Sequence, residues 1–312
     1  MVTRKSPRKG SLQFWPRKRA AKILPTINWD AIKSEKTLKG FIAYKAGMKS
    51  AYLDDSTEHS MTKGKKKVFP VTILECPSMK IFSVRLYKDG IVKTEILGEG
   101  LDKELKKLVK LPKTQKKLDS IKPEEYDDVR IIAYSQVKKT GLKKTPDITE
   151  LGLNGTYEDK LAFAKEKIGK EITVADVFES GQLVDLRGVT KGKGLQGPVK
   201  RFGIQLKNQK SEKGRRRPGS LGPWHPARVT FRVPQAGQLG MFTRVVYNNK
   251  VLDLGKAEDK FKGIKNYGDI KTDYIILEGS VQGPAKRQIV LTQALRPTKK
   301  QLKKKHELIE LR

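Results

Sequence analysis

The residues that most resemble a chemical site form a glycine-rich segment. Positions 192–197 read Gly-Lys-Gly-Leu-Gln-Gly, the G-x-G-x-x-G pattern of dinucleotide-binding turns, and they follow a predicted strand. That chemistry needs a helix directly after the turn, so that the helix N-terminus faces the pyrophosphate. Here Pro198 follows without the apolar periodicity of a packed helix, and positions 215–217 are all arginine. We predict instead that the glycines bring the backbone close to phosphates of a larger polyanion, beside Lys191 and Lys193. A merely flexible loop is the alternative.

Metal-dependent and nucleophilic chemistry finds no support in the sequence. The three histidines, His59, His225 and His306, are far apart, and none belongs to an H-x-x-x-H pair. Cys76 is the one cysteine, which excludes a disulfide within the chain and a cysteine zinc cluster and suits a reducing intracellular compartment. Neither a G-x-S-x-G elbow nor a G-K-[ST] phosphate loop is present. We expect no catalytic activity, no metal, no cofactor and no small-molecule substrate.

Net charge indicates a different kind of chemistry. The 312 residues hold 67 Lys+Arg against 34 Asp+Glu, a formal net charge of +33. Such a chain repels itself and needs a polyanion, and nucleic acid releases counterions when Lys and Arg neutralise its phosphates. The excess gathers in two segments: 1–29 holds eight cations and no acid, and 187–232 holds thirteen cations and one acid. A membrane is the weaker candidate, because no stretch approaches the ~18 apolar residues of a spanning helix.

Aromatic residues inside these two segments sharpen the prediction. Trp15 and Trp224 stand among cations in Gly- and Pro-rich sequence, where no apolar core is available to them. Stacking on unpaired RNA bases, with guanidinium groups on phosphates, suits both kinds of side chain. Folding back onto the globular part is the alternative. The candidate RNA-binding residues are the cations and rings of both segments: Arg4, Lys5, Arg8, Lys9, Trp15, Arg17, Lys18, Arg19, Lys191, Lys193, Lys200, Arg201, Arg215, Arg216, Arg217, Trp224, His225, Arg228 and Arg232.

Between these arms the chain has the pattern of a globular protein that is mainly β. Asp89-Gly90 is a strong hairpin turn, and a leucine spacing near 101–108, ended by Pro112, predicts a helix. A second short amphipathic helix is expected at 161–168. Many short strands with few helices favour a β-barrel core, and Trp29 is expected in that core. The predicted strands are 40–53, 68–75, 80–88, 91–97, 129–137, 183–189, 228–233, 243–252 with a turn at Asn248-Asn249, 274–277 and 288–292.

These elements suggest five parts. They are a basic N-terminal arm at 1–30, a β-barrel core at 31–97 and 171–296, an inserted lysine-rich α+β lobe at 98–170, a basic finger at 190–232 within the core, and a basic C-terminal tail at 297–312 that forms a short helix. The finger lacks the hydrophobic periodicity of a packed element, so we expect it to be disordered in the free protein and ordered by its partner.

Three motifs carry a family resemblance. Positions 190–197 (TKGKGLQG), 222–228 (GPWHPAR) and 236–240 (AGQLG) resemble the signature of the universal large-subunit ribosomal protein three family, as does the arm at 8–19. Order, spacing and approximate length match over essentially the whole chain. The tryptophan-bearing tip is similar to the archaeal and eukaryotic branch, and the modest length favours the archaeal one.

The resemblance implies a split β-barrel, related to a domain of translation elongation factors, with an inserted α+β lobe. It implies a structural protein of the large ribosomal subunit, cytoplasmic, that binds large-subunit rRNA early in assembly. Its extensions would buttress the peptidyl-transferase centre, with Trp224, His225 and Arg228 at the finger tip, and its body would lie beside neighbouring ribosomal proteins. Neither membrane binding nor a homo-oligomer is implied. Glu212 and Lys193 occupy positions that are histidine in some eukaryotic members, so the methylation known at the first is not expected here.

Two other classes of protein remain as alternatives. One is an RNA-modifying or ribosome-assembly enzyme with basic substrate-binding arms, which would need a cofactor pocket. The other is a chromatin-type DNA-binding protein, which irregular Gly- and Pro-rich arms suit less well than threading into folded RNA.

Overall fold

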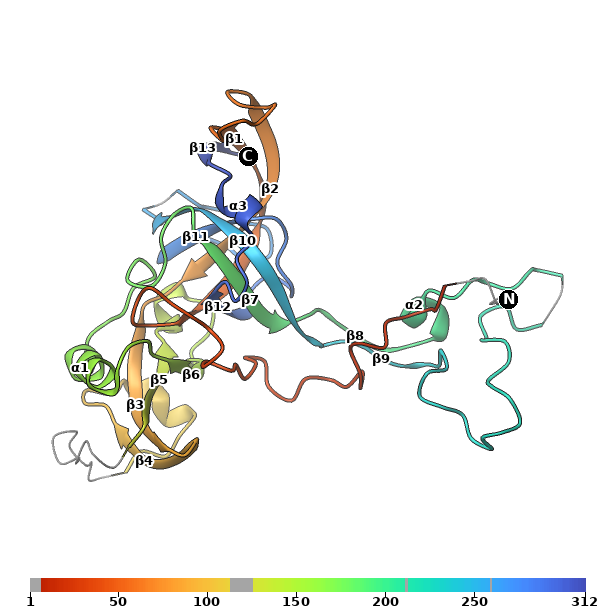
Figure 1. The fold of residues 1–312 in the computed structure, drawn as a ribbon, viewed down its shortest axis with the longest axis horizontal. Coiled ribbons are helices and arrows are strands. Elements are labelled where there is room, and N and C mark those ends of the chain that lie inside the picture. The colour runs from red at the N-terminus through yellow and green to blue at the C-terminus, as the bar shows by residue number, and fades with distance from the viewer. Residues whose placement is uncertain (1–6, 113–125, 211–212, 259) are drawn as a thin grey trace. The chain divides into compact units, whose positions relative to one another are not determined.

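The computed structural model describes residues 7–112, 126–210, 213–258 and 260–312, and its chain divides into two compact units (Figure 1). We call Met1–Lys22 with Val189–Thr243 the arm–finger unit, and Ile23–Gly188 with Arg244–Arg312 the body. Each is described by itself. The candidate residues Arg4 and Lys5 lie outside the described residues, as does Glu212.

The body contains a barrel of antiparallel strands. Its neighbours follow the order β12 (Gln288–Gln293), β7 (Leu183–Val189), β10 (Thr243–Lys256), β11 (Asp273–Glu278), β2 (Lys66–Cys76) and β1 (Gly40–Asp55). A further pairing of β12 with β1, in which Phe41 lies opposite Leu291, closes this order on itself. The fully buried residues of these strands include the aromatic Phe41 and the β-branched Ile42 and Ile275. The prediction of a mainly β protein with few helices is therefore confirmed.

Strand β1 is long enough to serve two neighbours at its two ends. Its first residues, 40–44, pair with β12, whereas 51–55 pair with β13 (His306–Leu311). The predicted C-terminal helix is thus mostly wrong, because the helix α3 (Lys299–Leu302) is a single turn and a strand follows it. The sequence His-Glu-Leu-Ile-Glu-Leu alternates with the period of a strand, and Leu308 and Leu311 pack against the buried cluster around Leu53.

The remaining strands of the body form a second sheet. Its order is β4 (Ile91–Leu97), β3 (Met79–Lys88), β5 (Asp128–Ser135) and β6 (Ile148–Gly152). The predicted hairpin at Asp89-Gly90 is confirmed: both residues have the positive φ, 52° and 73°, that a type I′ turn requires. The sequence places β3 and β4 in the core, and in the structure they share this sheet with β5 and β6, which the sequence places in the lobe. The division into a core at 31–97 and 171–296 and a lobe at 98–170 stays a prediction.

Helices in this part of the body are short. The helix α1 (Tyr157–Lys167) includes all but the last residue of the predicted 161–168 and starts four residues earlier. It begins with a reciprocal capping box between Thr156 and Asp159. The leucine spacing near 101–108 gives only a one-turn 3-10 helix, η1 (Lys103–Lys107), which buries Leu105, and a second such turn is η4 (Val137–Thr140). The helix predicted at 101–108 is therefore corrected to this single 3-10 turn.

Two further local predictions are wrong. The expected turn at Asn248-Asn249 does not interrupt β10, because Asn248 takes a φ of 58° within the strand and its backbone N–H donates to the Asp185 carboxylate at 2.9 Å. The expected strand at 228–233 is absent from the described chain, since no neighbouring strand pairs with that sequence.

Trp29, by contrast, is buried as predicted, and a side chain at Gly152 would place its Cβ 2.5 Å from that of Trp29.

Candidate nucleic-acid interface

A two-stranded ribbon forms the base of the finger. β8 (Gly192–Gln196) pairs antiparallel with β9 (Gly237–Gly240), so that Gly192 lies opposite Gly240. At Gly240 the φ is +76°, and an added Cβ would lie 2.0 Å from the carbonyl oxygen of Lys191. Glycine is therefore required at position 240, where the two strands approach most closely. The G-x-G and A-G-Q-L-G motifs, far apart in sequence, are thus the two strands of one ribbon.

A helix does follow the glycine motif, although the sequence did not predict one, and it is very short. α2 (Pro198–Phe202) follows Gly197 directly, with proline at its favoured first position. Its buried residue, Phe202, packs inside the arm–finger unit. The preceding strand belongs to an antiparallel ribbon rather than to the parallel sheet of a dinucleotide-binding fold. The segment therefore matches the sequence pattern of a dinucleotide-binding turn but lacks the parallel sheet and the long helix of such a site.

An aromatic cluster joins the arm to the finger. The Trp15 ring stacks on Phe202 with centroids 6.4 Å apart and meets Phe231 edge-on at 5.2 Å. The Arg17 guanidinium lies over the same rings, 5.2 Å from the centroid of Trp15 and 4.2 Å from that of Phe202. Such contacts combine apolar burial with cation–π attraction. Trp15 thus has protein partners in the finger, an arrangement that the sequence prediction did not include.

Backbone hydrogen bonds reinforce the same junction. Ala20 N–H donates to the Met241 carbonyl at 2.8 Å, and the Arg8 guanidinium donates to the Arg232 carbonyl at 2.8 Å. Arg201 donates to the carbonyls of Gln238 and Gln235, both at 3.0 Å. Burial lowers the pKa of the Arg201 guanidinium. Several cations predicted to bind RNA therefore also fasten the unit internally.

Most of the other candidates are exposed. Half-buried positions are Lys9, Trp15, Arg17 and Arg201. Trp224 at the finger tip is 87% exposed, and Phe231 is 62% exposed. The exposed candidates are Arg8, Lys18, Arg19, Lys191, Lys193, Lys200, Arg215, Arg216, Arg217, Trp224, His225, Arg228 and Arg232.

The arm–finger unit has almost no internal countercharge. Its sequence holds twenty cations and a single acid, Glu212. No ion pair joins residues of this unit within the described part of the chain. Exposed cations without carboxylates, next to exposed aromatic rings, are the combination that backbone phosphates and unpaired bases require.

Sequence reasoning missed Phe202 and Phe231 as parts of this site. Both are apolar rings next to cations, the same signal that singled out Trp15 and Trp224. Nothing local in the sequence indicates that they meet Trp15.

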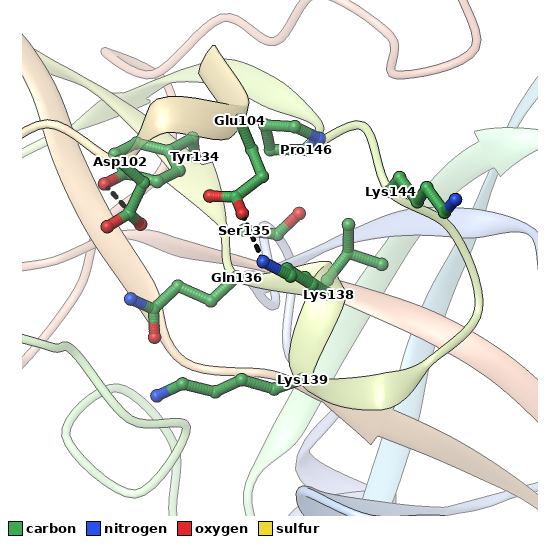
Figure 2. A pocket seen from close by; sticks show the side chains of 10 residues that line it. Asp102, Glu104, Tyr134, Ser135, Gln136, Lys138, Lys139, Lys144 and Pro146 are labelled. Carbon is green, nitrogen blue, oxygen red and sulfur yellow. Dashed lines mark hydrogen bonds and ion pairs between the residues drawn. The ribbon is translucent and has the colours of Figure 1, made fainter.

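The body also has a surface hollow of about 210 Å³ (Figure 2). Its polar side chains bind one another: the Tyr134 hydroxyl donates to Asp102 at 2.9 Å, and Lys138 pairs with Glu104 at 2.7 Å. Burial, followed by the hydrogen bond to Asp102, raises the pKa of Tyr134. These bonds fasten η1 against β5 and η4, and none of the predicted site residues lines the hollow.

Two searches of the described residues bear on the other classes of site. No group of three or more His, Cys, Asp or Glu side chains among them is placed to hold a metal ion. None of the helices in the described ranges has the length and apolarity that a membrane crossing requires.

The fold and the site together define a β-barrel protein that carries a basic, irregular extension. Comparison with known proteins gives the family. The chain belongs to the family described as ribosomal protein L3, whose profile matches residues 1–312. It is similar to the large ribosomal subunit protein uL3 of Methanocaldococcus jannaschii, at 41% identity over 93% of this chain and 92% of the relative. The uL3 proteins of Archaeoglobus fulgidus (41% identity, 94% and 93%) and Methanobrevibacter smithii (40%, 96% and 95%) are similar over comparable spans. These relatives are ribosomal proteins and not enzymes, which confirms the predicted family and its archaeal type.

Proposed function

We propose that this protein is a structural constituent of the large ribosomal subunit in the cytoplasm, and that it binds large-subunit rRNA through its arm–finger unit. The observation that carries the proposal is the charge of that unit, twenty cations against one acid, most of them exposed. Membership of the ribosomal protein L3 family supports large-subunit rRNA as the polyanion. Neighbouring large-subunit proteins would be its other partners.

Two physical effects account for the binding. Each Lys or Arg that meets a phosphate releases condensed counterions, which gives an affinity that falls steeply with salt. Exposed rings such as Trp224 add stacking on unpaired bases, about 1–3 kcal/mol per base. Because the cations lie on an irregular backbone, specificity comes mostly from the shape of the folded RNA.

The charge of the arm–finger unit also suggests how its binding affects the subunit. By neutralising phosphates on RNA helices that approach one another, it lowers their repulsion and supports early assembly of the subunit. In the finished particle, the tip with Trp224, His225 and Arg228 buttresses the peptidyl-transferase centre without taking part in the chemistry. The barrel corresponds to the split barrel of a translation-factor domain, and its strand order supports that assignment.

Sedimentation of a gentle cell lysate, before and after a high-salt wash, tests the proposal. We expect one copy of the chain per large subunit, retained at high salt because the extension is enclosed by RNA. A chain that runs free, or only with precursor particles at less than one copy each, would contradict a structural role and favour an assembly factor.

A further inference from the structure

A second group of cations lies on the body, outside every segment assigned to RNA by sequence. Lys63 and Lys65 lie in the loop between β1 and β2, and Lys66 is the first residue of β2. Lys299, Lys300 and Lys303 belong to α3 and its C-terminal cap. All six are exposed. We call them the lysine end. In Figure 1 the ends of β1 and β2 lie close to β13 and α3, on the side of the body away from β3 to β6.

A buried carboxylate holds the first half of the lysine end in place. Asp55 is 2% exposed and accepts hydrogen bonds from Ser60 at 2.9 Å, Thr62 at 2.6 Å and Lys67 at 2.6 Å. The hydrogen bond from Lys67, first among several, keeps the pKa of Asp55 well below its usual range. This network folds residues 56–65 back on the strand end, so that Lys63, Lys65 and Lys66 face outward.

The second half is fastened to the same loop and to the barrel. Ser56 N–H donates to the Lys305 carbonyl at 3.0 Å, and Lys305 N–H donates to the Thr57 hydroxyl at 2.9 Å. From β10, the buried Lys250 donates through its ammonium group to the carbonyls of Gln301, in α3, and of Lys304, just after it. Two segments more than 230 residues apart are therefore fixed side by side.

The charge of the lysine end is not neutralised within the protein. None of its six ammonium groups has a carboxylate within ion-pair distance among the described residues. Of the nearby acids, Asp55 pairs with Lys67 and Glu58 pairs with Lys305 at 3.6 Å. Asp54 lies opposite both Lys66 and Glu307 in the sheet, but neither of these two acids forms an ion pair with the six lysines among the described residues. Like charges fixed close together raise the free energy of the folded chain unless an external anion offsets them.

We infer that the lysine end is a second RNA-binding surface, which receives backbone phosphates of a different RNA segment from that bound by the arm–finger unit. RNA is favoured over a protein partner because lysine is depleted at protein–protein interfaces, whereas a flexible ammonium is a good point charge for phosphate. The inference rests on the proposed function only for the identity of the nucleic acid.

Lysine acetylation of intact large subunits tests the inference in the particle. Acetylation followed by mass spectrometry should find the six lysines at least about fivefold less reactive than in the free protein, and ribonuclease treatment should restore their reactivity. Full reactivity in the intact subunit, or protection that persists after the RNA is digested, would overturn the inference. Absence of the chain from large subunits would instead overturn the proposed function.

Substitution in the full-length chain separates a local site from a general charge effect. A variant with all six lysines changed to Gln should bind a large-subunit rRNA transcript with a log–log salt slope smaller by about 0.7–0.9 for each lysine that meets a phosphate. The matched control changes six other exposed body lysines to Gln and has the same net charge: Lys93, Lys103, Lys106, Lys107, Lys110 and Lys170. Equal slopes for the two variants would contradict a localised surface, and a smaller slope for the lysine-end variant alone would support it.

Discussion

The arm–finger unit and the body differ in how far their positive charge is balanced by nearby acids. The unit holds about a quarter of the residues and more than half of the net charge, with twenty cations against one acid, whereas the body holds 47 cations against 33 acids. In the body, Arg130 binds Asp30, Asp128 and Glu150 at 3.1–3.2 Å. In the unit, Arg17 instead lies over aromatic rings.

The two regions thus differ in whether their cations have carboxylate partners. Cations with such partners stabilise the fold, whereas cations without them can bind an external anion. A guanidinium with carboxylate neighbours is already neutralised and offers little to RNA. A guanidinium on a ring face or a backbone carbonyl keeps its charge, and so contributes both to the fold of the unit and to its field. Charge pairing, rather than charge itself, therefore distinguishes the two regions.

The largest effect expected of the changes below concerns three arginines of the finger that have no carboxylate partner among the described residues. Changing Arg215, Arg216 and Arg217 to Gln should lower the salt slope of rRNA binding by about 2–3 and should lower the affinity more than any of the single substitutions that follow. Filter binding at several salt concentrations measures it. Three exposed body lysines, Lys93, Lys103 and Lys106, changed to Gln provide the control, and an equal loss there would abolish the distinction between the regions.

The two tryptophans of the unit should differ in what they affect. Trp15→Ala removes the centre of the aromatic cluster and should destabilise the unit by about 1–3 kcal/mol, less than the ~3–5 kcal/mol for a fully buried ring. Hydrogen exchange of the β8–β9 amides measures it. The control is Trp224→Ala, which should leave that exchange unchanged while weakening RNA binding. Faster exchange in both variants, or in neither, would show that the cluster does not hold the arm to the finger.

In the body, a change of charge should affect stability rather than binding. Arg130 is 18% exposed in its side chain, and Arg130→Gln removes the cation that Asp30, Asp128 and Glu150 share. Asp128 keeps Lys160 and Glu150 keeps Arg85, and the change should cost about 1–3 kcal/mol of the free energy of unfolding. The exposed pair of Lys138 with Glu104 is the matched control, and Lys138→Gln should have little effect. Denaturant unfolding measures both. A loss of rRNA affinity for Arg130→Gln without loss of stability would contradict the comparison.

The smallest effect expected is a pH dependence at β13. The His306 side chain is 3% exposed, and neither ring nitrogen has a hydrogen-bond partner among the described residues. Burial lowers the pKa of His306 below its ordinary value of 6.5. As pH falls, the unfolded chain therefore takes up a proton at His306 before the folded chain does. The contribution of neutral His306 to the free energy of unfolding is complete above about pH 6.5 and declines as pH falls through the folded pKa.

A melting series between pH 7.5 and 5.5 measures that decline. We expect a lower Tm at pH 5.5 for the natural chain and a smaller decrease for His306→Leu, which cannot gain a proton. The same decrease in both would assign the pH dependence to other groups.

Local patterns predicted the elements well and their partners poorly. Strand alternation and the Asp89-Gly90 turn depend on neighbours in sequence, so β3 and β4 were predicted nearly residue by residue. Their pairing with β5, rather than with the barrel, depends on which surfaces meet after collapse, and no local signal carries it. In the site, composition was enough to find the exposed cations. The contact of Trp15 with Phe202 was not predictable, because it joins segments without periodicity across 187 positions.

The junction of arm and finger has a consequence for the order in which the chain is made. Trp15 emerges during synthesis 187 residues before Phe202 and still earlier than Phe231. At about 5–20 residues per second, the arm exists for about 10–40 s without the rings that receive it. During that interval its eight cations keep it soluble and available, so a nascent chain can meet RNA through its arm before its finger has been translated.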